Sequence, residues 1–170
     1  RMVYTAFLAL ALLFFYPFLS GENILSFRDL SLYFYPLRQL MVEMVKGGQL
    51  PLWNPYIFCG YPLLATLQVG FFYPLSVLYY LLPFDLAFNY FTILHYFLAA
   101  SFMFMLTRHF GLSRAASFLA GVVFSFSGYT LSMANMNTTL TSVTWVPLAF
   151  LFFDKLINPH PLNPPLHQGW

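Results

Sequence analysis

Long apolar runs separated by short polar breaks dominate the chain, and this pattern predicts helices that cross a membrane. A crossing helix needs about 20 mostly apolar residues. Four stretches approach that length, namely residues 3–19, 87–106, 115–133 and 140–157. We therefore expect an all-α integral membrane protein with about four transmembrane helices.

The first of these runs has a second interpretation. Residues 3–19 are few and end near Ser20 and Gly21, as the apolar region of a signal peptide does. The junction lacks a convincing small-x-small cleavage pattern, and we favour a membrane span.

A fifth apolar run, residues 70–83, is broken by Pro74 and closed by Pro83. A run this short is more typical of an interfacial or re-entrant segment than of a full span. We expect an interfacial helix over about 70–82, inside an external loop from residue 20 to 85.

The positive-inside rule supports this assignment, since it gathers the basic residues of the short loops on the cytoplasmic side. Those residues are Arg1, Arg108, His109, Arg114 and Lys155. Topology anchoring is the simplest role for Arg108, His109 and Arg114.

A second interfacial helix is predicted over about 27–46, where Leu30, Leu37, Met41 and Met44 recur at helical intervals. Ser26 with Asp29 has the spacing of a capping box, and Pro36 is expected to kink the middle. Glycines 47 and 48 end the helix.

Composition strengthens the membrane assignment and excludes other classes. Hydrophobic residues make up 60% of the chain and charged residues 7%, whereas soluble domains carry about 25% charged residues. The surface therefore faces lipid for the most part, and the aromatic share of 22% suits interfacial belts. A net charge of +2 is too small and scattered for nucleic-acid binding.

The single cysteine, Cys59, excludes an internal disulfide and a cysteine-based metal site, and we expect it to be a small buried filler. Because the chain begins with Arg1, we expect its true start to be missing. Residues 158–170 are rich in proline and predict a disordered tail or a truncation. The remaining residues, 1–157, form a single membrane domain, and we expect the fragment to be inactive alone.

Polar residues that the membrane does not explain are the candidates for chemistry. Residues 26–48 hold five of the twelve charged residues. Asp29 there is either a helix cap or a general base, and both roles can hold together. His95 lies within a span, where a bond to a neighbouring helix is the commoner role for a histidine. Trp53 is favoured as an interfacial anchor, with stacking against a ligand as the alternative.

Three segments together resemble the bacterial YfhO-like membrane proteins of the GT-C glycosyltransferase superfamily. They are "D…YFYPLR" at 29–38, "G-x-LPLWNPYIFCGYPLLA" at 48–65 and "GLSR-x-A-x-FLAGVVFSFSGY" at 111–129. The likeness covers nearly residues 1–157 and implies a GT-C-like N-terminal part. It also implies a multi-pass protein of the bacterial inner membrane.

What the resemblance implies is transfer of a sugar from a polyprenyl-phosphate-linked donor at the external face of the bilayer. Asp29 would be the catalytic carboxylate, and Arg38 the first phosphate ligand because its guanidinium binds oxygens in pairs. Arg28 and Tyr33 complete the predicted substrate-binding set. Asn135 and Asn137 stand where some relatives keep acidic metal ligands, which puts a metal-dependent mechanism in doubt, and we assign no metal and no cofactor.

Two alternatives to the transferase remain open. One is a transporter of lipid or polysaccharide precursors, for which Pro147 inside the last span is the supporting feature. The other is a non-catalytic membrane protein or an inactive fragment.

Overall fold

The structure is a computed structural model that describes residues 2–158. All its regular elements in this part are helices, and the only strand-like pairing is an isolated bridge between Asn54 and Tyr61. Arg1 and nearly all of the predicted tail lie outside the described residues. The expectation of an all-helical protein is confirmed.

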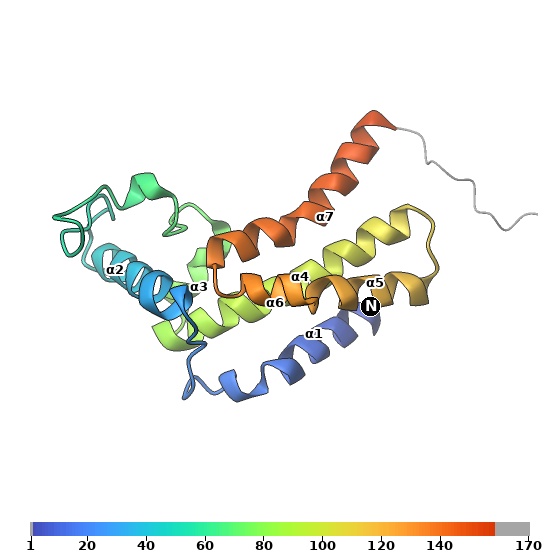
Figure 1. The fold of residues 1–170 in the computed structure, drawn as a ribbon, viewed down its shortest axis with the longest axis horizontal. Coiled ribbons are helices and arrows are strands. Elements are labelled where there is room, and N and C mark those ends of the chain that lie inside the picture. Colours follow the sequence, from blue (N-terminus) through green and yellow to red (C-terminus); the bar gives the residue numbers. More distant parts are fainter. Residues whose placement is uncertain (1, 159–170) are drawn as a thin grey trace, which may run out of the picture. The chain divides into compact units, whose positions relative to one another are not determined.

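The elements follow one another in the order shown in Figure 1. The α-helices are α1 (Met2–Phe14), α2 (Tyr35–Lys46), α3 (Leu78–Leu81), α4 (Phe84–His109), α5 (Arg114–Ser125), α6 (Gly128–Met133) and α7 (Asn137–Ile157). A π-helical turn covers Leu30–Phe34, and 3-10 turns cover Tyr16–Phe18, Leu64–Thr66 and Pro74–Val77.

Three helical segments of the described chain are long and apolar enough to cross a membrane. They are Phe84–His109, Arg114–Met133 and Asn137–Ile157. These match the predicted spans 87–106, 115–133 and 140–157, and they identify a protein with membrane-type helices.

The first predicted span is not confirmed as a single crossing helix. Helix α1 has 13 residues, or about 20 Å at 1.5 Å per residue, against about 30 Å of hydrocarbon. The break comes at Pro17, which sits inside the 3-10 turn Tyr16–Phe18. Proline lacks the N–H that an α-helix would need there.

The chain forms two compact units and passes between them four times, once within α4 between Ile93 and Leu94 and once within α7 between Thr138 and Thr139. The first consists, in its described part, of residues 2–14, 94–133 and 139–158; the second consists of residues 15–93 and 134–138.

In the first unit, small residues let α5 approach α4 closely. Ser117, Gly121 and Ser125 are buried at four-residue intervals along α5. A Cβ built at Gly121 would meet the carbonyl oxygen of Ala100 and the ring of Phe7, each at 2.7 Å. Such stripes allow membrane helices to pack backbone against backbone.

Aromatic rings complete the packing of this unit. Phe7 of α1 stacks on Phe118 with centroids 4.9 Å apart, and meets Phe104 edge-on at 6.0 Å. Helix α1, the second half of α4 and α5 accordingly lie side by side (Figure 1). The hydroxyl of Tyr96 donates to the carbonyl of Thr130 at 3.0 Å, which ties α4 to α6.

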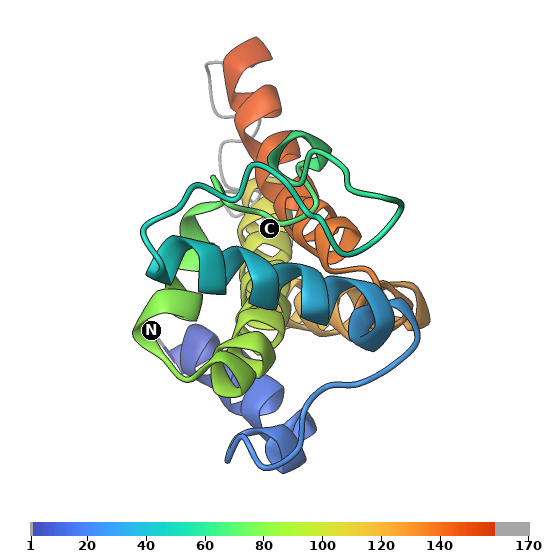
Figure 2. The ribbon, with the colours of Figure 1, turned by 90° about the vertical axis from the view of Figure 1, so that its left-hand side faces the viewer.

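In the second unit, α2 and the loop that follows it surround the start of α4. Figure 2 looks onto α2 and the loop of residues 47–77 that leads back to α3. The core of this unit is apolar and strongly aromatic, and its fully buried members include Leu63, Val69, Tyr79, Phe88 and Phe91.

Asn89 fastens the start of the loop to α4. Its side-chain oxygen accepts from the amide of Leu25 at 2.9 Å, and its side-chain nitrogen donates to the carbonyls of Phe18 and Asn23 at 3.0 and 2.7 Å. This one buried amide satisfies three backbone groups that have no helical partner.

Candidate functional site

The predicted site residues lie on the helix that runs from Leu30 to Lys46 or directly before it, and Pro36 shapes the first half of this helix. The N–H of Tyr35 bonds to the carbonyl of Leu30, five residues earlier, which gives the π-helical turn Leu30–Phe34. Proline has no N–H and its ring crowds the preceding turn, so a widened turn relieves the clash. The expected disturbance at Pro36 is thus a π-turn.

The predicted capping box at the start of this helix is wrong. The Asp29 side chain makes no capping hydrogen bond. The amide of Leu30 instead bonds to the carbonyl of Phe27 at 3.0 Å and to the side-chain oxygen of Asn135 at 3.4 Å. A residue far along the chain therefore caps the helix.

Asp29 and Arg28 are both exposed at this helix start. The Asp29 carboxylate makes no hydrogen bond or ion pair within residues 2–158, which leaves its oxygens accessible. The Arg28 guanidinium lies over the ring of Phe27 at 5.6 Å, and its backbone has a positive φ of 44°. The two residues therefore offer one free carboxylate and one exposed cation.

Arg38 lies in a different environment, fully buried with 1% of its surface exposed. Its Nη1 donates to the hydroxyl of Tyr79 at 2.8 Å. The guanidinium carbon lies 4.4 Å from the ring centre of Phe91 and 5.3 Å from that of Tyr79. Aromatic faces attract a desolvated cation, and these two rings enclose it.

No carboxylate of the described residues forms an ion pair with Arg38, and its Nε has no hydrogen-bond partner there. Burial raises the pKa of the Tyr79 hydroxyl, and the neighbouring Arg38 opposes that rise. In this conformation Arg38 acts as a structural residue. For it to bind a phosphate, the surrounding rings would have to move.

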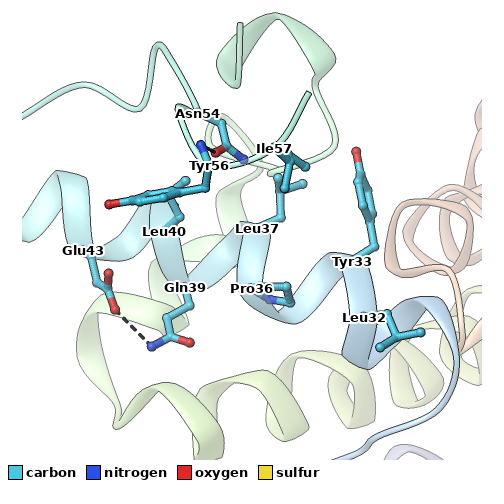
Figure 3. A pocket seen from close by; sticks show the side chains of 10 residues that line it. All are labelled: Leu32, Tyr33, Pro36, Leu37, Gln39, Leu40, Glu43, Asn54, Tyr56 and Ile57. Carbon is cyan, nitrogen blue, oxygen red and sulfur yellow. Dashed lines mark hydrogen bonds between the residues drawn. The ribbon is translucent and has the colours of Figure 1, made fainter. Parts of the chain in front are cut away.

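Tyr33, the fourth predicted site residue, lines a cavity of about 400 Å³ between the same helix and the loop that follows it. The polar groups of the cavity come from Tyr33, Gln39 and Glu43 on the helix and from Asn54 and Tyr56 on the loop (Figure 3). Its apolar wall consists of Leu32, Pro36, Leu37, Leu40 and Ile57.

The loop side of this cavity, hereafter the first-loop cavity, is held in place by the bridge between Asn54 and Tyr61. Each backbone amide donates to the carbonyl of the other residue at 2.9 Å. The Asn54 side chain also accepts from the amide of Tyr56 at 2.9 Å, an Asx turn. Trp53 covers Gly60 so closely that a Cβ there would lie 2.6 Å from its ring.

The chemistry of the first-loop cavity favours hydroxyl-bearing ligands. Gln39 donates to Glu43 at 3.0 Å, which positions a carboxylate and an amide together (Figure 3). Burial and the neighbouring Tyr61 raise the pKa of Tyr33, so its phenol stays protonated. No Lys, Arg or His lines the cavity, which makes it a poor site for a phosphate and a suitable one for a neutral polyol.

Other residues singled out in the sequence lie elsewhere. His95 is buried in α4, and its carbonyl accepts from the Thr144 hydroxyl at 3.4 Å. Asn137 is buried, and neither polar atom of its side chain has a partner among the described residues. The expectation for Cys59 is wrong, because this residue is exposed in the loop after Trp53.

Two polar residues of this unit escaped the sequence reasoning. The Tyr35 hydroxyl donates a hydrogen bond to the Asp85 carboxylate, and burial followed by that bond raises the pKa of Tyr35 to about 12. Glu43 lines the first-loop cavity. The available signal was the four-residue spacing of Gln39 and Glu43, which places both on one helix face.

Comparison with protein families, curated proteins and solved structures finds no match to this chain. Groups of three or more His, Cys, Asp or Glu side chains able to hold a metal ion are also absent from residues 2–158. The argument for function therefore depends on the residues and the geometry just described.

Proposed function

We propose that the protein is a membrane glycosyltransferase of the GT-C type, acting on a polyprenyl-phosphate-linked sugar at the external face of a bacterial inner membrane. This chain would be its N-terminal part. The observation that carries the proposal is the first-loop cavity, whose hydroxyl-binding groups come from the helix that runs from Leu30 to Lys46 and from the loop after it. The free carboxylate of Asp29 stands at the start of the same helix.

The lining of the cavity supports a sugar as ligand. Carbohydrates present hydroxyl groups on an otherwise weakly polar ring, and proteins bind them with carboxylates, amides and aromatic faces. Glu43, Gln39 and Asn54 supply the first two kinds of group, and the phenol ring of Tyr33 supplies the third. Because no basic residue lines the cavity, its lining favours a neutral sugar over a phosphate group.

We assign Asp29 to act on an acceptor at the edge of this cavity. It precedes the cavity-lining Tyr33 by four residues along the chain. Its exposed carboxylate is free to accept a proton. Arg28, the adjacent exposed cation, is a better first contact for a phosphate than the buried Arg38.

The proposed reaction balances as a displacement at the anomeric carbon of the donor. The acceptor oxygen forms a bond to that carbon while the bond from the carbon to the phosphate oxygen breaks. The polyprenyl phosphate leaves with the electron pair, and the acceptor proton passes to Asp29.

The test is a transfer assay on the whole product of the gene in membranes, with a radiolabelled polyprenyl-phosphate sugar. Asp29→Asn should lower the transfer rate about 100-fold or more, the range for loss of a general base. The matched control is Glu22→Gln, which removes another exposed carboxylate of the same loop and should leave the rate unchanged. Full activity of Asp29→Asn would remove the base assignment.

A second measurement separates binding from chemistry. Glu43→Gln should raise KM and change kcat little, because the residue is assigned to ligand binding. Donor binding without transfer, or transport of the donor across the membrane, would instead favour the non-catalytic or transporter alternatives.

A further inference from the structure

A second cavity, of about 620 Å³, lies in the first unit, and its polar lining is almost entirely basic. Arg108 and His109 come from the end of α4, Arg114 from the start of α5 and Lys155 from the last turn of α7. Three of the chain's seven Lys and Arg residues thus converge on one cavity. Residues that only set topology need not converge in this way.

The positive charge of this basic cavity is only slightly offset. Asp154 contributes one negative charge, and its carboxylate lies 2.7 Å from His109 Nε2. Arg108 donates to the backbone carbonyl of Leu112. Arg114 and Lys155 are exposed and form no ion pair within the described residues. The cavity therefore keeps a net positive charge, which favours the binding of an anion.

The rest of the lining is apolar. It is completed by Met2, Val3 and Tyr4 of α1, Phe104 and Met105 of α4, and Leu151 of α7. The rings of Tyr4 and Phe104 pack edge to face with centroids 5.9 Å apart. Contact with such apolar surfaces does not stabilise a small hydrated anion, whereas burial against them stabilises an acyl chain.

The position of the cavity along the helices agrees with a lipid ligand. Helix α4 has 26 residues and extends about 39 Å, more than the hydrocarbon core, so its last turn reaches the headgroup layer. By the positive-inside rule the end that carries Arg108, Arg114 and Lys155 is cytoplasmic. The cytoplasmic leaflet is also the one with the negative surface potential.

We propose that the basic cavity binds the headgroup of an anionic phospholipid from the cytoplasmic leaflet. Arg108, Arg114 and Lys155 bind the phosphate, and an acyl chain lies against Phe104, Met105 and Leu151. Basic pockets between membrane helices are suited to this chemistry. The inference does not depend on the proposed glycosyltransferase function.

The test measures lipid binding to the purified chain by native mass spectrometry in neutral detergent. Phosphatidylglycerol should bind more tightly than phosphatidylcholine with the same acyl chains. Arg114→Gln and Lys155→Gln should each weaken phosphatidylglycerol binding about fivefold, the loss of roughly 1 kcal/mol per cation. The double variant should abolish the preference over phosphatidylcholine.

Lys46→Gln is the matched control, because it removes an exposed cation of the first loop and should leave the preference intact. The thermal midpoint in phosphatidylcholine reports whether each variant is folded, and Arg114→Lys should retain most binding. Equal affinity for both lipids, or an unchanged preference in the double variant, would overturn the proposal. Full competition by soluble glycerol phosphate would show that the site binds a free phosphate and not a lipid.

Discussion

Arg38 Nη1 and the hydroxyl of Tyr79 are 2.8 Å apart, and this hydrogen bond links α2 to α3 inside the core of the second unit. A buried guanidinium usually pairs with a carboxylate, because desolvation without compensation is costly. Here the compensation comes from one phenol oxygen and from the faces of Tyr79 and Phe91.

Removal of that phenol oxygen should therefore destabilise the protein. Tyr79→Phe keeps the ring but leaves Arg38 without the bond, and we expect a loss of about 1–3 kcal/mol in the free energy of unfolding. Thermal or denaturant unfolding in detergent measures it. Tyr80→Phe is the control, because the Tyr80 hydroxyl is buried without a hydrogen-bond partner and its removal should cost nothing. Equal losses in both variants would contradict the role given to the bond.

The bond between Tyr35 and Asp85 predicts a pH dependence at the alkaline end. The pKa of Tyr35 rises from 10.0 to about 12 in the folded chain, so folding favours the protonated phenol. Its stabilising contribution is complete below about pH 10 and is lost as the pH rises through 12.

Tyr35→Phe isolates this contribution. The stability difference between the native chain and Tyr35→Phe should be constant below pH 10 and should shrink above it. Denaturant unfolding at a series of pH values measures that difference, in which the other tyrosines cancel. A stability difference that grows above pH 10 would contradict the predicted rise in the pKa of Tyr35.

The close approach of α5 to α4 predicts that Gly121→Ala is destabilising. The added methyl would overlap the Ala100 carbonyl and the Phe7 ring, and such overpacking costs about 1–3 kcal/mol. Gly128→Ala meets nothing within 4 Å and should be neutral or slightly stabilising, since alanine favours helix. The two thermal midpoints should move in different directions or, at the least, by clearly different amounts.

In the first loop, Gly60→Ala should be more harmful than Gly48→Ala. Both glycines have positive φ, 96° and 76°, but only at Gly60 would the methyl enter the ring of Trp53. Gly48→Ala should cost about 1 kcal/mol from backbone strain alone. Limited proteolysis of residues 50–61 should detect the opened loop in Gly60→Ala and an intact loop in Gly48→Ala.

The long helices were predictable because their apolar runs depend on local sequence alone. The runs 87–106, 115–133 and 140–157 each fall inside an observed helical segment. Helices α4 and α7 extend past the apolar runs into polar residues such as Asp85 and Asn137. Hydropathy indicates which residues can face lipid, but it does not indicate where the backbone hydrogen bonds of a helix end.

The details of the candidate site were less predictable, because they depend on contacts between distant residues. Local spacing suggested that Asp29 helps to cap its helix, yet the helix is capped by Asn135. Arg38 was expected to face a ligand, and the structure encloses it between Tyr79 and Phe91. No window of neighbouring residues contains that information.

The enclosure of Arg38 also constrains how the protein is made. Tyr79 follows Arg38 by 41 residues, and Phe91 comes later still. Until Tyr79 and Phe91 have been synthesised, the guanidinium has neither of the rings that enclose it. Translation must reach α4 before both rings can pack against Arg38. A nascent chain that stalls earlier therefore has an arginine at the membrane without these aromatic neighbours.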